Sequence, residues 1–357
     1  MATGPGAART CIVGLGDPVV DVLVKVSSKN LEQLGLQCGG SVSLHKQQIN
    51  ELLKQVADDG HRTNVHGGSA ANVLKGLGNL ALQQRSARFM GMVGLDDAGR
   101  QFHDHFKQQH VDPLLLTSTS GKATATCLCL LTPDGERTMR THLGASSELD
   151  KAEQLPEGWT NNCRLLHCEG YCLYKPELTR GAMQAAKAAG AEVCLDTASF
   201  EVVRNCWQTL LNLLEEGLVD LLLCNADEAL AVAEMAGVTC RDDELESMEA
   251  AQRFLLRHCK VCVVSRGSKP CVVRSSSGQT LTCATPEVDV VDTVGAGDCF
   301  AAGFLYAYLR GANLQACAAC GCILGSEAVS TSGAELSPGQ WQNMRHTIAK
   351  QLAEHAS

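Results

Sequence analysis

Short apolar runs alternate along the chain with segments in which apolar positions recur at helical spacing. Six apolar runs are typical of buried strands: Thr10–Gly14, Arg88–Gly94, Arg164–Cys168, Glu192–Asp196, Leu218–Asn225 and Lys260–Ser265. Helical spacing covers Asp97–His110, Pro176–Ala189, Val203–Glu215, Asp227–Ala236 and Leu245–His258. Strands that alternate with helices build a mostly parallel sheet covered on both faces, so the pattern predicts an α/β fold of three layers, α/β/α. Ligands of such sheets bind beyond the carboxyl ends of the strands.

Two stretches interrupt this alternation. Val24–Val65 is polar and mixed, with one helical piece near Lys46–Ala57. Ala123–Thr141 carries β-branched and apolar residues on both sides of Pro133-Asp-Gly135, which is typical of a β-hairpin. A hairpin placed among strand–helix units must leave the sheet or add to its edge. We therefore predict one small β subdomain, a lid formed by about 24–65 and 123–141, within a single domain that spans residues 1–357.

Composition and charge narrow the function. Hydrophobic residues make up 45% of the 357 residues and charged residues 19%, as in a globular protein. The net charge of −9 and the 4% of aromatic residues do not favour a nucleic-acid partner. The chain has no apolar run of the roughly 20 residues that a membrane helix needs. Met1–Arg9 leaves little room for a signal peptide, so we expect a cytoplasmic protein.

The 19 cysteines do not indicate an oxidised scaffold, because the chain is long and has its own core. Several lie within apolar elements, where they act as small hydrophobes: Cys194, Cys262, Cys317 and Cys320. Cys317-x-x-Cys320-x-Cys322 and Cys259-x-x-Cys262 have spacings seen in metal sites. A closed zinc site needs four ligands, and the sequence offers no second pair. We predict buried free thiols at both places.

The most informative segment runs from Val288 to Gly311. Its apolar residues change from strand spacing before Asp292-Thr293 to helical spacing after Asp298. Gly295-Ala-Gly297 therefore lies at a helix N-terminus, where backbone N–H groups and the helix dipole favour an anion. Glycine allows that anion to approach the backbone closely.

Asp298 directly follows this anion site. A carboxylate there would repel a bound phosphate, but it would serve as the general base for a hydroxyl that attacks the phosphorus. The alternative is an acid that only benefits from the helix dipole at the start of a helix. Asp292-Thr293 before the glycines and the apolar helix after them favour the catalytic interpretation.

The segment from Asp292 to Asp298, Asp-Thr-Val-Gly-Ala-Gly-Asp, resembles the C-terminal signature of the ribokinase-like (PfkB-type) carbohydrate kinase family. Four shorter motifs follow the family in order and spacing: Gly67-Gly68-Ser-Ala-Ala-Asn72, Gly91-Met-Val-Gly94-Leu-Asp96-Asp-Ala-Gly99, Asn225-Ala-Asp-Glu228 and Ser265-Arg-Gly267-Ser-Lys269. The resemblance covers almost the whole chain. It implies the ribokinase-like fold with a β lid, and a phosphotransferase that uses ATP and Mg²⁺ on a sugar or nucleoside alcohol.

The resemblance also implies a role for each matching residue. Asp298 would be the base, and the amides of Gly295, Ala296 and Gly297 would stabilise the transferring phosphoryl group. The implied contacts to substrate hydroxyls come from Asp17, Asp21, Gly67, Gly68 and Asn72. Asn225, Ser265, Gly267 and Thr293 would line the ATP site, with Glu228 acting on Mg²⁺ through water. Arg140, on the second hairpin strand, would reach a phosphate or remain a solvated strand charge.

Within the family, Gly16-Asp17-Pro18-Val-Val-Asp21 resembles the adenosine-kinase branch, in which Asn-Pro precedes the sugar-binding Asp at the same spacing. The overall pattern also resembles plant-type PfkB-like proteins. We rank a ribonucleoside first and a free pentose or hexose second, with a catalytically silent sugar- or nucleotide-binding relative as the third interpretation. Asp17 in place of Asn leaves the hydroxyl contacts open. The sequence also leaves open a monomer or a homodimer and a dependence on K⁺.

Overall fold

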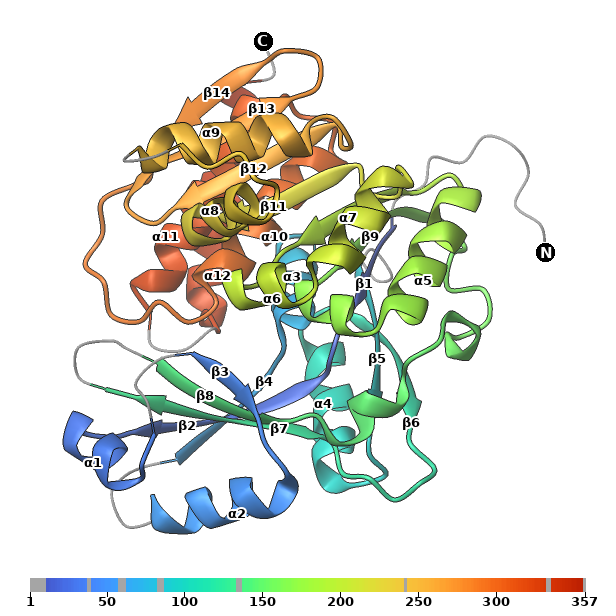
Figure 1. The fold of residues 1–357 in the computed structure, drawn as a ribbon, viewed down its shortest axis with the longest axis vertical. Helices are drawn as coiled ribbons and strands as arrows, with labels where there is room; N and C mark the ends of the chain where they lie inside the picture. The colour runs from blue at the N-terminus through green and yellow to red at the C-terminus, as the bar shows by residue number, and fades with distance from the viewer. Residues whose placement is uncertain are drawn as a thin grey trace.

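A nine-stranded sheet forms the centre of the protein (Figure 1), with strand order β14-β13-β12-β11-β10-β9-β1-β5-β6. The computed structural model describes residues 11–36, 40–56, 62–81, 87–132, 137–240, 243–331 and 335–355. Neighbouring strands from β12 to β6 are parallel, whereas β13 and β14 add in antiparallel fashion. The strands are β1 (Cys11–Leu15), β5 (Ala87–Val93), β6 (Asp112–Thr117), β9 (Cys163–Cys168), β10 (Glu192–Asp196), β11 (Leu221–Asn225), β12 (Val261–Arg266), β13 (Lys269–Ser275) and β14 (Thr280–Cys283).

Helices cover both faces of this sheet and bury two apolar cores. One core contains residues of α5 (Pro176–Ala188), α6 (Phe200–Asn205), α7 (Trp207–Glu215), α8 (Ala226–Met235) and α9 (Glu244–Leu255). The other contains residues of α3 (Ser69–Ala81), α4 (Asp97–Gln108), α10 (Ala296–Leu309), α11 (Leu314–Val329) and α12 (Pro338–Glu354). Three short 3₁₀ helices are η1 (Gly144–Glu148), η2 (Ala152–Gln154) and η3 (Gly170–Tyr174). The predicted three-layer α/β/α fold is confirmed.

A second, five-stranded sheet with mixed strand directions lies beside the first (Figure 1), and we call it the small sheet. Its strand order is β3-β8-β7-β2-β4, with β2 (Val19–Lys25), β3 (Ser41–Ser43), β4 (Arg62–Gly67), β7 (Ala125–Leu131) and β8 (Arg137–His142). α1 (Ser28–Gln33) and α2 (Lys46–Gln55) accompany one face, against an apolar cluster of its own. The small sheet thus reaches from Val19 to Gly67, beyond the predicted range 24–65.

The predicted hairpin strands pair as antiparallel neighbours, β7 with β8. Its predicted turn, Pro133-Asp-Gly135, lies outside the described residues. The predicted helix over Val203–Glu215 is instead two helices, α6 and α7, which meet at Cys206. No strand was predicted for the residues of β6, β13 and β14. Cys194, Cys262, Cys317 and Cys320 are fully buried free thiols in the apolar cores, as predicted.

The chain passes between the two sheets at points that matter for function. β1 leads through Gly16 and Asp17 directly into β2, and β4 leads through Gly68 into α3. The carboxyl ends of the parallel strands face the small sheet. Residues at these crossings are therefore held by both sheets.

Candidate active site

A cavity of about 850 Å³ lies between the small sheet and the carboxyl ends of the parallel strands. β2, β7 and β8 contribute side chains from one side, and β10, β11, η3 and the start of α10 contribute from the other. Most of the residues predicted to be functional line it: Asp17, Asp21, Gly68, Asn72, Asn225, Glu228, Ser265, Thr293, Gly295, Gly297 and Asp298. Residues separated by more than 200 positions in the sequence thus meet in one cavity.

The N-termini of two helices converge on Asp298. Gly295 caps α10 with φ of 72°, a left-handed conformation that favours glycine, and Asp298 lies in the first turn of the helix. The hydroxyl of Ser69, at the start of α3, donates to Oδ1 of Asp298 over 2.8 Å. Nδ2 of Asn72 donates to Oδ2 over 2.8 Å. The carboxylate is thereby fixed in orientation beside the anion-binding end of α10.

Asn72 also presents a buried acceptor atom that a ligand can bind. Its Oδ1 atom is buried and, among the described residues, has no hydrogen-bond partner. A buried acceptor without a partner costs about 1–3 kcal/mol, which a hydroxyl donor from a bound molecule would recover. Because Nδ2 of the same side chain holds Asp298, a hydroxyl bound to Oδ1 would lie close to that carboxylate.

Asp21 lies on β2, in register with Cys127 on β7 and Val65 on β4. Burial raises the pKa of Asp21 to about 7, which Lys75 opposes and the negative charge of Asp298 reinforces. A Cβ atom at position 67 would lie too close to Oδ2 of Asp21, so any larger residue there would displace this carboxylate. Asp21 can accept two hydroxyl donors once it is ionised, and this arrangement suits a vicinal diol.

Asp17 and Glu169 form a buried acidic pair at the end of β1 and β9. Oε1 of Glu169 accepts from the backbone N–H of Asp17 over 2.9 Å, and Oε2 accepts from that of Ala70 over 2.8 Å. Burial raises the pKa of Glu169, and the charge of Asp17 raises it further. Nζ of Lys175 lies 2.5 Å from Oδ1 of Asp17 and supplies the balancing positive charge.

Glu228 closes the other end of the cavity, in a capping box at the start of α8. Its Oε2 accepts from the Thr197 hydroxyl over 2.6 Å and from the Asn225 N–H over 2.9 Å. Its Oε1 accepts from Nδ2 of Asn225 over 2.7 Å. Burial and neighbouring acids raise the pKa values of both Glu228 and Asp196. A divalent cation nearby would relieve this repulsion, so the residues fit Mg²⁺ held through water.

Comparison with known proteins identifies the family to which this chain belongs. The profile of the pfkB family carbohydrate kinases matches residues 43–340. The chain belongs to the pfkB family. It is therefore a kinase that transfers a phosphoryl group to an alcohol acceptor, and kinases of this family use ATP and Mg²⁺.

Two curated relatives and one solved structure show what the pfkB family kinase resembles. Adenosine kinase of Schizophyllum commune is 26% identical over 314 residues, 84% of this chain and 89% of the relative. The 5-dehydro-2-deoxygluconokinase of Geobacillus thermodenitrificans is 24% identical over 273 residues, 73% and 77% of the two chains. The crystal structure of adenosine kinase from Sinorhizobium meliloti is 27% identical, with a TM-score of 0.83 and coverage of 96% and 99%.

Some predicted residues of this pfkB family kinase do not line the cavity. Arg140 is the clearest correction: its neighbours Met139 and Thr141 face the cavity, so β-strand alternation points Arg140 to the opposite face of the small sheet. Its guanidinium is buried there and donates to the Met139 carbonyl. Leu128 also packs in the cluster on that same opposite face. Gly67 and Ala296 are next to lining residues, and Gly267 is two positions from Ser265, but none of the three lines the cavity.

Two of the residues predicted to contact ATP, Ser265 and Asn225, come from neighbouring strands. Ser265 is the second-last residue of β12 and is in register with Asn225 of β11. Gly267 has φ of 59°, which allows the tight turn between β12 and β13. Thr293 precedes the cap of α10 and lines the cavity with Gly295 and Gly297. His66 and His142 do not line the cavity, in keeping with a structural or exposed role for each.

Sequence reasoning missed several further lining residues, among them Ser69, Glu169, Tyr171, Lys175 and Asp196. A signal existed for Asp196 and Glu169, because each is an acid at the carboxyl end of a predicted parallel strand. Ser69 lies within the glycine motif but was not given a role. No local pattern marks Lys175, whose partner Asp17 is 158 positions away.

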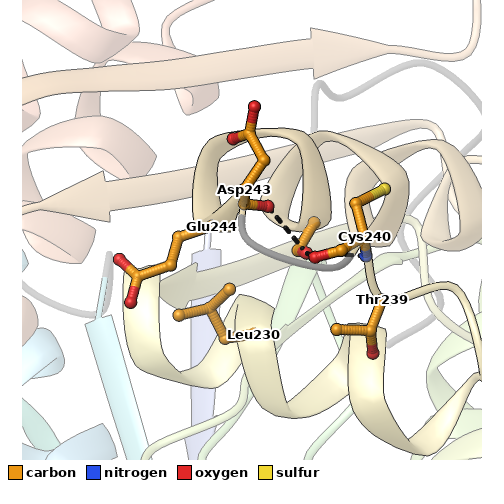
Figure 2. Close-up of a pocket in the computed structure, with 6 residues that line it drawn as sticks. Leu230, Thr239, Cys240, Asp243 and Glu244 are labelled. Atoms are coloured by element: carbon orange, nitrogen blue, oxygen red, sulfur yellow. Dashed lines mark hydrogen bonds between the residues drawn. The ribbon is translucent and has the colours of Figure 1, made fainter.

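A second, smaller pocket of about 550 Å³ lies apart from this site, at the start of α9 and the end of α8 (Figure 2). The Ser247 hydroxyl contacts the carbonyls of Cys240 and Asp243 and accepts from the Cys240 N–H. Oδ1 of Asp243 accepts from the Glu246 N–H and caps α9, so both side chains are engaged in local hydrogen bonds. Among the described residues, no helix of the kinase is long and apolar enough to cross a membrane.

Proposed function

We propose that this protein phosphorylates the 5′ hydroxyl of a ribonucleoside with the γ-phosphoryl group of ATP, and that Asp298 is the base. The observation that carries the proposal is the placement of the Asp298 carboxylate beside the N-terminus of α10, held by Ser69 and Asn72. A carboxylate fixed next to an anion site is suited to remove a proton from a hydroxyl that attacks the bound phosphoryl group.

The acceptor would bind on one side of Asp298, and ATP would bind on the other. The acceptor oxygen would attack the γ-phosphorus, its proton would pass to Asp298, and ADP would leave. The first amides of α10, at Gly295, Ala296 and Gly297, would stabilise the transferring oxygens. Asn225, Ser265, Gly267 and Thr293 would contact ATP, and Glu228 would orient the water shell of Mg²⁺. Mg²⁺ supplies charge neutralisation between the phosphates.

The charges of the cavity favour a neutral acceptor over a sugar acid. Asp17, Asp21 and Glu169 lie on the acceptor side of Asp298. Among the described residues that line the cavity, Lys175 is the single cation, and it is already paired with Asp17. The carboxylate of a gluconate-type substrate would meet these acids without an available cation. The charges of the cavity therefore favour a nucleoside or a neutral sugar over an acidic substrate of the kind that the name of the 5-dehydro-2-deoxygluconokinase relative implies.

Apolar and aromatic surface favours a nucleoside over a free sugar. Leu23, Met139 and Cys127 of the small sheet face the cavity opposite Tyr171 and Tyr174 of η3. A purine would use this surface for packing and stacking, whereas a free pentose is too small to cover it. Binding energy from the base would then support the transition state of the reacting hydroxyl. The likeness to adenosine kinases agrees with this ranking.

A comparison of kcat/KM for adenosine, inosine, cytidine, ribose and fructose tests the proposal. We expect the nucleosides to exceed both free sugars. A clear preference for ribose or fructose would move the assignment to a free-sugar kinase and leave the family assignment standing. ATP consumption with none of the acceptors, in a protein that still binds adenosine, would instead identify a silent binding relative.

The second part of the proposal concerns closure. The small sheet would act as a lid that swings toward α10 when an acceptor binds and excludes water from ATP. Its support is that Asp17 and Gly68, at the junctions of the two sheets, both line the cavity. A variant in which β7 and β8 no longer pair should hydrolyse ATP faster in the absence of acceptor, and such an increase would support this role.

A further inference from the structure

Two thiols and one carboxylate meet on the cavity side of the small sheet. The ligand atoms of Asp21, Cys127 and Cys129 all lie within 4.8 Å of one another. Sγ of Cys127 is 3.5 Å from Sγ of Cys129, and Sγ of Cys129 is 4.0 Å from Oδ1 of Asp21. All three residues line the cavity of about 850 Å³, so a small solute can reach them.

The backbone dictates this meeting. β2 and β7 are parallel neighbours, and Asp21 is in register with Cys127. Cys127 and Cys129 are two positions apart on one strand, so strand geometry puts both side chains on the same face as Asp21. The arrangement therefore does not depend on a flexible loop, because hydrogen bonds between central strands of the sheet hold all three Cα atoms.

The separations fit a tetrahedral cation with sulfur ligands. Zn²⁺ bonds to thiolate sulfur at about 2.3 Å and to carboxylate oxygen at about 2.0–2.2 Å. Tetrahedral angles then put two sulfurs about 3.8 Å apart and a sulfur and an oxygen about 3.5 Å apart. The observed separations are 3.5 Å between the two sulfurs and 4.0 Å between sulfur and oxygen, so small rotations of the side chains would bring them to these values. A soft or borderline divalent cation suits two thiolates and one carboxylate.

We propose that Asp21, Cys127 and Cys129 form a site for a thiophilic divalent cation, Zn²⁺ or Cd²⁺, inside the acceptor pocket. Three protein ligands leave the fourth position open to water or a solute. Binding releases the two thiol protons to solvent: M²⁺, two Cys–SH and one carboxylate give the complex M(S)₂(O₂C)⁻, with a net charge of −1, and two H⁺. Binding is therefore tighter at higher pH.

The site has a consequence for the kinase, which rests on the proposed role of Asp21 in holding acceptor hydroxyls. A cation on Asp21 occupies the carboxylate oxygens that the diol would need. The cation would therefore inhibit by competition with the acceptor and not with ATP, whose predicted contacts lie across the cavity at Asn225, Ser265 and Thr293. Mg²⁺ prefers oxygen ligands and would leave the thiols unbound.

Titration of the full-length protein with Co²⁺, without substrate, tests the site directly. Tetrahedral thiolate-bound Co²⁺ gives a visible absorption band, and we expect it to saturate with a component that Zn²⁺ displaces. Cys127→Ser and Cys129→Ser should each weaken this component at least about tenfold, because each removes one of three protein ligands. Cys240→Ser is the matched control, since Cys240 is a part-exposed thiol beside the second pocket (Figure 2) and should leave the component unchanged.

Full absorption in both Cys127→Ser and Cys129→Ser would overturn the proposal. X-ray absorption of the wild-type protein with one equivalent of Zn²⁺ needs no variant and decides the case if a serine variant fails to fold. A shell of two sulfurs with oxygens supports the site, and three, four or no sulfurs contradict it. Cation binding without competition against the acceptor would keep the site but remove Asp21 from the acceptor contacts, so the two proposals fail separately.

Discussion

Nζ of Lys175 lies 2.5 Å from Oδ1 of Asp17, and both side chains are only 11% exposed. Burial alone would lower the pKa of Lys175, but the Asp17 carboxylate raises it above the usual value. The lysine also donates to the Ser146 carbonyl over 2.9 Å. In the adenosine-kinase branch that the motif resembles, Asn stands at position 17. Here a charge pair occupies that place, which explains how an acid is accommodated beside buried Glu169.

We predict that Lys175 and Asp17 are strongly coupled. Lys175→Met leaves Asp17 buried without a partner and should lower the free energy of unfolding by about 3–5 kcal/mol. The double variant Asp17→Asn with Lys175→Met should recover most of that loss, because no isolated charge remains. Denaturant unfolding of the two single variants, the double variant and the wild type measures the coupling. Additive effects would show that the pair is not coupled.

Gly67 should be essential for the acceptor contact. A Cβ atom at position 67 meets Oδ2 of Asp21, so Gly67→Ala must displace that carboxylate. A displacement of about 1 Å can cost about 10²-fold in catalysis, and we expect kcat/KM for the acceptor to fall by that order. Gly339→Ala is the control, because a Cβ there has no neighbouring atom within 4 Å. Steady-state kinetics with both variants checks the prediction, and an unchanged kcat/KM in Gly67→Ala would refute it.

Acceptor binding should depend on the ionisation of Asp21. Its pKa is raised by burial to about 7, so below that pH the carboxyl carries a proton and loses acceptor capacity. Affinity for 5′-deoxyadenosine, which has no hydroxyl to phosphorylate, should rise as pH increases through about 7. Calorimetric titration across this range measures the change. Asp21→Asn should bind weakly at every pH, and an unchanged pH profile in that variant would assign the titration to another group.

His167 should make the fold sensitive to acid. It is fully buried on β9, and neither ring nitrogen has a hydrogen-bond partner among the described residues. Burial lowers its pKa from 6.5 to about 4. Between these values the unfolded chain binds a proton that the folded chain does not, so stability falls as pH decreases from about 6.5 to about 4, by about 3 kcal/mol at most.

His167→Leu removes both the titration and the two buried nitrogens. We expect this variant to unfold at higher denaturant concentration than the wild type, most clearly near pH 5. Denaturant unfolding at two pH values separates the terms. If wild type and variant lost stability in parallel on acidification, the acid sensitivity would arise from other groups.

The sequence predicted those parts of the site that local patterns mark. Helical spacing after Asp298 predicted α10, and glycine spacing predicted Gly295 at its start. The strand predicted before Asp292 does not form, since Val288, Val290 and Val291 are exposed and lie outside any strand. Acids at the carboxyl ends of strands follow from the parallel topology alone. These features depend on neighbours in the sequence, where periodicity and turn chemistry are informative.

Features that depend on long-range contacts could not be predicted. Asp21 was predicted to contact substrate hydroxyls, but its place in the middle of β2 of the small sheet depends on register with β4 and β7. Arg140 was left as either a phosphate contact or a solvated strand charge, because the face of β8 that it occupies depends on the register of the sheet. The contacts of Asp17 with Lys175 and Glu169 join segments more than 150 positions apart, which no local window contains.

The interpretation of Asp298 as a helix-start acid has a matched control within the chain. Asp97 occupies the first turn of α4, as Asp298 does in α10, but its side chain is 84% exposed and lies outside the cavity. If the helix dipole were the reason for both acids, Asp97→Asn and Asp298→Asn would cause similar small losses of stability and no loss of turnover. The account predicts a catalytic defect for Asp298 alone.

The most direct measurement is the turnover of purified Asp298→Asn with the best acceptor, alongside its affinity for ATP. Asparagine keeps the size of the side chain and one carbonyl oxygen, which can accept from Asn72, while its amide can donate to the Ser69 hydroxyl. It cannot take up the proton of the acceptor hydroxyl. We predict that kcat falls by about 10²–10⁴-fold while the fold and ATP binding are retained. Turnover of Asp298→Asn near the wild-type rate would contradict the role of Asp298 as the base.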